Sequence, residues 1–177
     1  PFFVVLAILV KFSSNGPIFY QSERVGQRGV RFKIYKFRTM IKEADQIKNK
    51  LLAQNERSGP LFKIKNDPRV TKIGRILRQY SLDELPQLMN VLIGSISLVG
   101  PRPHLPSEVE KYQKYHRRLF AIKPGITGMA QVNGRSNNDF EREVALDLSY
   151  IENWSIWLDL EIIIKTIVVV VKGEDAA

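Results

Sequence analysis

The chain has 177 residues, 44% of them hydrophobic and 25% charged, which is typical of one folded domain with a real core and excludes a disordered protein. Its formal net charge of +9 indicates a polyanionic partner: a nucleic acid, an anionic membrane surface or a phosphorylated small molecule. The absence of cysteine excludes disulfides, thiolate catalysis and cysteine-ligated zinc.

Residues 1–12 form an apolar run. As a helix this run would extend about 18 Å, whereas the hydrocarbon core of a bilayer is roughly 30 Å thick, so it cannot span a membrane. It is apolar on all sides and therefore needs either lipid or a protein core around it. We favour lipid and keep a core as the alternative. The residues expected to contact the membrane are Pro1, Phe2, Phe3, Leu6 and Leu9.

Residues 17–38 alternate apolar and polar side chains around a turn at residues 26–29. This pattern predicts two short strands joined in a hairpin. Side chains alternate between the faces of a strand, so the second strand would present a cationic face beside an apolar one. A binding surface and an ordinary solvated face both fit this pattern.

Three segments then have helical patterns. Residues 41–55 are mostly polar and predict a peripheral helix. Residues 67–78 predict an amphipathic helix that packs inward while lining something anionic, and its basic face would consist of Arg69, Lys72, Arg75 and Arg78. Residues 81–92 predict a helix whose core face would consist of Leu85, Leu88, Met89 and Leu92.

The C-terminal half contains shorter elements. The pattern predicts a strand at 94–99, a helix at 105–120, an extended piece at 129–132, a loop at 134–138 and a helix at 139–157. Residues 159–171 are rich in Ile and Val and fit either a buried strand or an interfacial helix. The expected fold class is therefore α+β, mostly helical, with a small β-hairpin and interfacial amphipathic helices.

Two adjacent carboxylates, Asp83 and Glu84, lie between the basic segment and a Gly-Pro-Arg-Pro turn at residues 100–103. Their simplest explanation is structural, because Ser81 followed three residues later by Glu84 has the pattern of a helix capping box. The neighbouring cations favour a chemical role, since they keep a carboxylate ionised and hence nucleophilic or metal-binding. The arrangement indicates phosphate chemistry on an acidic substrate.

A series of motifs covers nearly the whole chain in order: Gly16-Pro17-Ile18-Phe19-Tyr20, Glu23-Arg24-Val25-Gly26, Lys36-Phe37-Arg38-Thr39-Met40, Asp67-Pro68-Arg69, Ser81 to Leu88, Ser97 to Pro103 and Lys123 to Gly128. Together they resemble the bacterial sugar transferase family, the monotopic polyprenyl-phosphate phosphoglycosyl transferases. The resemblance implies transfer of a sugar 1-phosphate from a UDP-sugar to a polyprenyl phosphate, typically undecaprenyl phosphate, with release of UMP. Glucose, galactose and N-acetylated sugars all remain open.

The resemblance also implies roles for individual residues. Asp83 would attack the β-phosphorus and form a covalent phosphosugar-aspartate, and Mg²⁺ on the diphosphate would be held through Asp83 with Glu84 near it. Glu84 would otherwise orient or deprotonate the acceptor. Arg102 resembles the family's phosphate-binding arginine. Further candidates for the anionic pocket are Lys36, Arg38 and Arg78. Metal binding and an ordinary ion pair both remain open for Asp147 and Asp159.

By the same resemblance, Pro1 takes the place of a proline that breaks a re-entrant membrane helix. Residues 1–12 would be the exit arm only, and residues 13–177 the catalytic domain on the cytoplasmic face of a bacterial inner membrane. The segment at 44–62 resembles that of larger family members, which favours exopolysaccharide or capsule initiation. Glu143 departs from the family, in which a basic residue is expected in many relatives.

Two rival functions follow from composition. A nucleic-acid-binding domain would use the positive charge and aromatic residues for phosphate contacts and stacking. A noncatalytic membrane scaffold would retain the apolar segments but would have no use for Asp83, Glu84 and Arg102 together. We therefore expect a UDP-sugar, a polyprenyl phosphate and membrane lipid as partners, and no nucleic acid.

Overall fold

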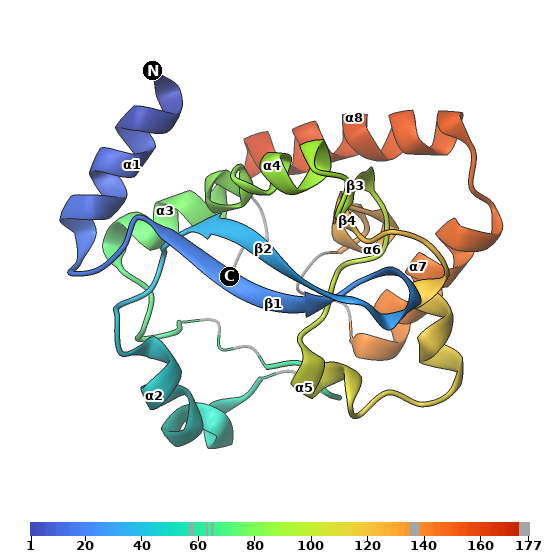
Figure 1. The fold of residues 1–177 in the computed structure, drawn as a ribbon, viewed down its shortest axis with the longest axis horizontal. Helices are drawn as coiled ribbons and strands as arrows, with labels where there is room; N and C mark the ends of the chain where they lie inside the picture. Colours follow the sequence, from blue (N-terminus) through green and yellow to red (C-terminus); the bar gives the residue numbers. More distant parts are fainter. Residues whose placement is uncertain (57–58, 63, 65, 135–138, 174–177) are drawn as a thin grey trace.

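An antiparallel hairpin, β1 (Phe19–Val25) and β2 (Arg31–Phe37), crosses the middle of the molecule (Figure 1). The computed structural model describes residues 1–56, 59–62, 64, 66–134 and 139–173. The strands pair from Phe19 opposite Phe37 to Val25 opposite Arg31, and the short 3-10 turn η1 (Gln27–Gly29) joins them. The predicted hairpin is confirmed, and so is the α+β class, because helices surround two small two-stranded sheets.

The N-terminal helix α1 (Phe2–Ser13) lies at one edge of the molecule (Figure 1). Leu6 and Val10 pack against Phe37 and Leu77, so one side of the helix belongs to a protein core. Leu6, expected at the membrane, is only 4% exposed and lies in that core. The other side is open to solvent, and the exposed residues of this set are Pro1, Phe2, Phe3 and Leu9. In the part of the chain that the structure describes, no helix has the length and apolar character needed to cross a bilayer.

The segment after the hairpin is less helical than predicted. Residues 41–55 contain only the short helix α2 (Ala44–Lys48) and the 3-10 helix η2 (Asn49–Gln54). Helix α3 (Lys72–Gln79) begins five residues after Asp67, because the Thr71 hydroxyl caps it by accepting a hydrogen bond from the Gly74 N–H at 2.9 Å. Arg69 does not join a basic helix face but forms a buried ion pair with Asp67, with 2.6 Å between Nη2 and Oδ2.

The segment with the paired carboxylates differs most from its prediction. It forms the 3-10 turn η3 (Leu82–Glu84) and the helix α4 (Gln87–Leu92). The capping-box prediction is wrong, since Ser81 has a φ of 51° and its side chain makes no capping bond. The predicted core face is confirmed for Leu85, which packs against a core cluster, and is wrong for the rest: Leu92 is 79% exposed whereas Asn90 is 1% exposed.

Asn90 explains this inversion. Its side-chain oxygen accepts a hydrogen bond from the Tyr35 N–H at 3.1 Å, and its side-chain nitrogen donates to the Lys33 carbonyl at 2.8 Å. The helix is therefore held to β2 by a buried amide, which leaves its apolar residues on the outside. The exposed apolar residues of this segment are Leu88, Met89, Leu92 and Ile93.

The C-terminal half is built around a parallel pair, β3 (Ser97–Val99) and β4 (Gly125–Thr127). The predicted strand at 94–99 is confirmed at 97–99, whereas residues 105–120 hold only the short helix α5 (Pro106–Val109) and most of the 3-10 segment η4 (Tyr115–Ala121). The extended piece expected at 129–132 is the short helix α6 (Met129–Val132). Most of the loop predicted at 134–138 lies outside the described residues.

Two longer helices complete the fold. The predicted helix at 139–157 is confirmed as α7 (Phe140–Glu152), which ends five residues earlier than predicted. The ambiguous segment that follows belongs to a second helix, α8 (Ile156–Lys172), which begins at residue 156. Helices α4 and α8 both contact β3 and run along the upper edge of the molecule in Figure 1. Exposed apolar residues of α8 are Ile156, Trp157, Leu160, Ile164, Ile167, Val168 and Val171.

Candidate functional site

A small pocket opens where the hairpin meets η3 and the Gly-Pro-Arg-Pro turn. Strands β1 and β2 contribute basic side chains to it, η3 contributes a carboxylate, and the turn contributes a guanidinium. The residues that line it are Arg24, Ile34, Lys36, Glu84, Gln87, Arg102, Pro103, Gly125 and Ile126. Three of the predicted site residues, Lys36, Glu84 and Arg102, thus come together from distant parts of the sequence.

Glu84 is the ionised carboxylate of this pocket. Its Oε1 accepts a hydrogen bond from the Lys36 Nζ at 2.7 Å. Burial opposes the charge, but Lys36 and then Arg102 outweigh it and lower the pKa of Glu84 to about 2. Glu84 therefore remains charged throughout the physiological pH range.

Asp83 lies beside the pocket and is only 7% exposed. Burial raises the pKa of its carboxyl, the negative charge of Glu84 adds to this, and the cations Lys36 and Arg78 act against it. The adjacent carboxylates thus have opposite tendencies. Glu84 has a direct cationic partner. A further positive charge beside Asp83 would lower the pKa of Asp83 and favour its ionised form.

Arg78 approaches Asp83 from the last turn of α3. Its Nε donates a hydrogen bond to the Thr39 hydroxyl at 2.9 Å. Burial lowers the pKa of Arg78, and the attraction of Asp83 opposes that shift. This residue, predicted for the anionic pocket, therefore belongs to the electrostatic surroundings of Asp83 and does not line the pocket.

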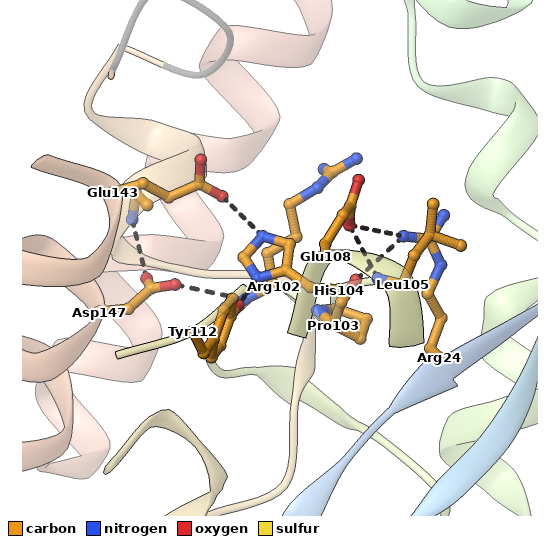
Figure 2. A network of polar contacts seen from close by, with 10 residues as sticks. Arg24, Arg102, Pro103, His104, Leu105, Glu108, Tyr112, Glu143 and Asp147 are labelled. Atoms are coloured by element: carbon orange, nitrogen blue, oxygen red, sulfur yellow. Dashed lines mark hydrogen bonds and ion pairs between the residues drawn. The ribbon is translucent and has the colours of Figure 1, made fainter. Parts of the chain in front are cut away.

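Arg102 projects from the turn at residues 100–103 between Glu143 on one side and Glu108 on the other (Figure 2). Its side chain is exposed. Desolvation by the surrounding protein opposes its charge, but Glu84 and then Glu143 outweigh this and raise the pKa of Arg102. The guanidinium is thus a permanent cation at the mouth of the pocket.

Asp147 of α7 holds the backbone of this turn. Its Oδ2 accepts the Arg102 N–H at 3.3 Å, and its Oδ1 accepts the Ala130 N–H at 3.2 Å (Figure 2). Burial, reinforced by Glu143, raises the pKa of Asp147 to about 7. Asp147 therefore positions the turn through its backbone and does not contribute a side chain to the pocket wall.

A second buried network supports the same turn. The ring of His104 contacts the Tyr112 hydroxyl through Nδ1 and the Glu143 Oε1 through Nε2 at 3.4 Å (Figure 2). Glu143, which departs from the expected basic residue, is only 4% exposed and faces both His104 and the Arg102 charge. The turn thus lies on buried polar side chains, which pack against the apolar cluster around Phe140.

Two predicted site residues lie elsewhere. The Arg38 Nη2 donates to the Val10 carbonyl at 3.1 Å and also to the Ser14 carbonyl, and its Nη1 donates to the Pro17 carbonyl. Arg38 therefore caps the C-terminus of α1. Asp159 accepts hydrogen bonds from the Tyr150 hydroxyl at 2.7 Å and the Trp154 Nε1 at 3.3 Å, at the start of α8.

Sequence reasoning assigned no role to Arg24, although it lines the pocket. The signal was present, since the residue stands in the motif Glu23-Arg24-Val25-Gly26 at the end of a predicted strand. Its partners lie on the turn and on α5, far away in the chain. The Pro103 carbonyl, for example, is 79 positions from Arg24. Only the tertiary structure shows that Arg24 and Arg102 meet.

The donor set of the site is compatible with Mg²⁺. Among the residues that the structure describes, no three histidine or carboxylate side chains are grouped as a complete metal cage. Mg²⁺ usually retains several waters and takes one or two carboxylates together with substrate phosphates, which matches a pair such as Asp83 and Glu84. Of the acidic residues considered, Glu84 lines the pocket and Asp83 lies beside it, whereas neither Asp147 nor Asp159 is a lining residue.

Comparison with known proteins gives a match across almost the whole chain. Residues 1–173 match the family model described as bacterial sugar transferase. The chain is 49% identical to the galactosyl transferase CpsE of Streptococcus agalactiae over 163 residues, which cover 92% of this chain and 36% of that protein. It is 42% identical to the exopolysaccharide production protein ExoY of Rhizobium meliloti over 94% of this chain and 76% of that protein.

A third relative is the undecaprenyl-phosphate galactose phosphotransferase of Salmonella typhimurium, at 44% identity over 92% of this chain and 35% of that protein. The chain therefore spans little more than a third of the length of two of these three relatives. What it shares with them is the segment that contains the pocket, the paired carboxylates and the apolar helices.

Proposed function

Because the chain belongs to the bacterial sugar transferase family, we propose that it transfers a sugar 1-phosphate from a UDP-sugar to undecaprenyl phosphate. This would be the first membrane step in the assembly of an exopolysaccharide or capsule. Relatives named for undecaprenyl-phosphate galactose transfer and for exopolysaccharide production support the substrate class. The observation that carries the proposal is a buried carboxylate, Asp83, beside a pocket with an excess of cations.

Asp83 is the proposed nucleophile. Its carboxylate oxygen attacks the β-phosphorus of the UDP-sugar, the bond from that phosphorus to the bridging oxygen breaks, and UMP leaves. A phosphate oxygen of undecaprenyl phosphate then attacks the same phosphorus, which releases the lipid-linked product and restores the Asp83 carboxylate. The covalent intermediate divides one difficult displacement into two easier ones.

The surroundings of Asp83 explain how it is activated. Because burial and Glu84 raise its pKa, the free protein holds this carboxyl less readily as an anion than an exposed aspartate. Mg²⁺, bound through Asp83 and Glu84, would neutralise phosphate charge and favour the ionised nucleophile. Lys36 and Arg102 would hold the phosphate groups, for which a guanidinium fork is well matched.

The low pKa of Glu84 favours one of its two expected roles over the other. An efficient general base has a pKa near the working pH, and a carboxylate with a pKa of about 2 is a poor proton acceptor. We therefore assign Glu84 to orienting Lys36 and holding the metal, instead of deprotonating the acceptor.

The exposed apolar faces of α1, α4 and α8 support attachment to a membrane surface. Together they expose far more large apolar side chains than isolated surface positions would require, and such patches mark membrane or protein contacts. We propose that α1 is the exit arm of a re-entrant membrane helix and that α4 and α8 lie at the lipid interface on the cytoplasmic face. The acceptor phosphate would then reach the pocket from the headgroup layer.

UMP release tests this function. The chain in mild detergent would be given a panel of UDP-sugars with undecaprenyl phosphate and Mg²⁺. We expect release with one sugar or a few, abolished by Asp83→Asn and by EDTA and retained by Asp45→Asn, a control at an exposed position on α2. UMP release that survives in Asp83→Asn would refute the nucleophile, and no release from any UDP-sugar would refute the transferase.

A further inference from the structure

Arg24 makes a long hydrogen bond with Pro103 and a long ion pair with Glu108. Its Nη1 is 3.4 Å from the Pro103 carbonyl oxygen and 4.0 Å from the Glu108 Oε2, both at the outer limit for such interactions. For comparison, the ion pair between Lys36 and Glu84 measures 2.7 Å. These partners place Arg24 but do not use the full hydrogen-bonding capacity of its guanidinium.

The Arg24 Nε is in fact without an acceptor. This nitrogen is buried and has no hydrogen-bond partner among the residues that the structure describes, while the side chain as a whole is 16% exposed. A buried donor without an acceptor is costly, and most such groups in native proteins have a partner. An unpartnered Nε in a pocket wall therefore points to an acceptor that is supplied by a ligand.

The charges around Arg24 indicate what kind of acceptor it needs. Arg24, Lys36 and Arg102 all line the pocket, whose wall has Glu84 as its one carboxylate among the described residues. Burial and then the nearby charge of Arg102 lower the pKa of Arg24. Arg24 and Arg102 repel each other as like charges. Glu108 lies between the two side chains (Figure 2) and offsets part of this repulsion, and an anion bound in the pocket that both arginines line would offset more of it.

We propose that Arg24 is a phosphate-binding residue that acts with Arg102 as a two-guanidinium clamp on the substrate. The inference rests on the proposed function and adds a residue from β1 to its binding site. The ligand is a phosphate group, which either the diphosphate of the UDP-sugar or the phosphate of the polyprenyl acceptor could supply. A planar guanidinium can donate through two parallel N–H groups to such a phosphate, and Nε is well suited to one of them.

Kinetics can separate the two sources of phosphate. In a two-step reaction with a covalent intermediate, kcat/KM for the UDP-sugar reports the first half-reaction and kcat/KM for undecaprenyl phosphate reports the second. We expect Arg24→Gln to lower one or both by about 10- to 100-fold, the loss typical of a hydrogen bond to a charged group. A fall for the UDP-sugar alone identifies the donor, a fall for the lipid alone identifies the acceptor, and equal falls identify the phosphoryl group that passes between them.

Matched variants distinguish binding from support of the fold. Arg31→Gln removes an exposed arginine from the same hairpin, and Glu108→Gln removes the ionic partner of Arg24 while retaining an oxygen that can accept the Leu105 N–H. Both should change either kcat/KM less than threefold, and Arg24→Lys should give an intermediate loss. For each variant, the affinity for the UDP-sugar and for the lipid would be measured in the Asp83→Asn background, and the Tm would be measured as well.

Two results would overturn the clamp. One is unchanged kcat/KM and unchanged binding in Arg24→Gln, and the other is an equal loss in Arg24→Gln and Glu108→Gln with a matching fall in Tm, which would make Arg24 a structural link. UMP release by the parent chain and its loss in Asp83→Asn are scored in the same assay. The inference can therefore fail while the proposed function stands.

Discussion

Replacement of Asp147 by Asn should make the stability of the protein less dependent on pH. The Asp147 side chain is 1% exposed, and burial with the neighbouring Glu143 raises its pKa to about 7 from an ordinary value of 3.8. The folded state thus binds a proton that the unfolded state has already lost between these two values. Stability should therefore fall as the pH rises through this range.

The size of the effect follows from the same two values. Each pKa unit corresponds to about 1.4 kcal/mol, so ionising buried Asp147 costs about 4 kcal/mol over the whole range and about 2 to 3 kcal/mol between pH 5 and pH 8. Asn cannot ionise, but it offers one oxygen to the two N–H groups of Arg102 and Ala130 that Asp147 accepts. The loss of one acceptor costs about 1 to 3 kcal/mol at every pH.

Urea unfolding in mild detergent measures this difference. We expect Asp147→Asn to be less stable than the parent chain at pH 5, and the difference to move in favour of the variant by about 2 to 3 kcal/mol by pH 8. Asp45→Asn controls for the loss of an exposed carboxylate.

A constant difference between the two proteins from pH 5 to pH 8 would refute the reasoning. It would mean that Asp147 stays ionised and that its two N–H bonds fully offset its burial. A metal role makes another prediction, because Mg²⁺ would then raise the urea midpoint of the parent chain but not that of Asp147→Asn. We expect equal effects of Mg²⁺ on both.

Three other changes test separate parts of the structure. Lys36→Met removes the cation that lowers the pKa of Glu84, so the acidic limb of the activity profile should move to higher pH. Gly74→Ala would place a Cβ 2.0 Å from the Thr39 carbonyl oxygen and should destabilise the protein by about 1 to 3 kcal/mol or more in urea unfolding. Leu92→Glu should weaken sedimentation with anionic vesicles and leave UMP release in detergent unchanged, since Leu92 is 79% exposed.

The sequence predicts best where local rules decide the structure. Alternation around a glycine turn is sufficient for the hairpin, and the long periodic pattern of residues 139–157 is sufficient for α7. Residues 129–132 are too few to show a period, and their pattern therefore predicts an extended piece where the structure has the helix α6. Residues 159–171 are apolar on nearly every side, and such a run fits a strand or a helix equally well.

Side-chain roles are harder to predict, because the contacts of a side chain depend on where its strand or helix ends and on the path of the backbone after that end. Lys36 and Arg38 are two residues apart and would share a face if the strand continued. Strand β2 ends at Phe37, however, and Arg38 turns to the carbonyls at the end of α1 while Lys36 reaches Glu84. Asp147 differs from a surface aspartate through its burial and through the backbone N–H groups of Arg102 and Ala130, both of which depend on the tertiary fold.

Helix α4 fails the usual rule for a different reason. In a helix that packs against a core, apolar side chains face inward, yet here Gln87 and Asn90 are buried while Leu92 faces out. The inversion is reasonable if the outer face meets lipid and the inner face meets the polar backbone of a catalytic hairpin. Binding of this apolar surface to lipid would then fix the position of the pocket relative to the membrane. An acceptor phosphate in the headgroup layer would lie close to the cations of the pocket. Loss of vesicle binding in Leu92→Glu should accordingly slow transfer to undecaprenyl phosphate in vesicles far more than transfer in detergent.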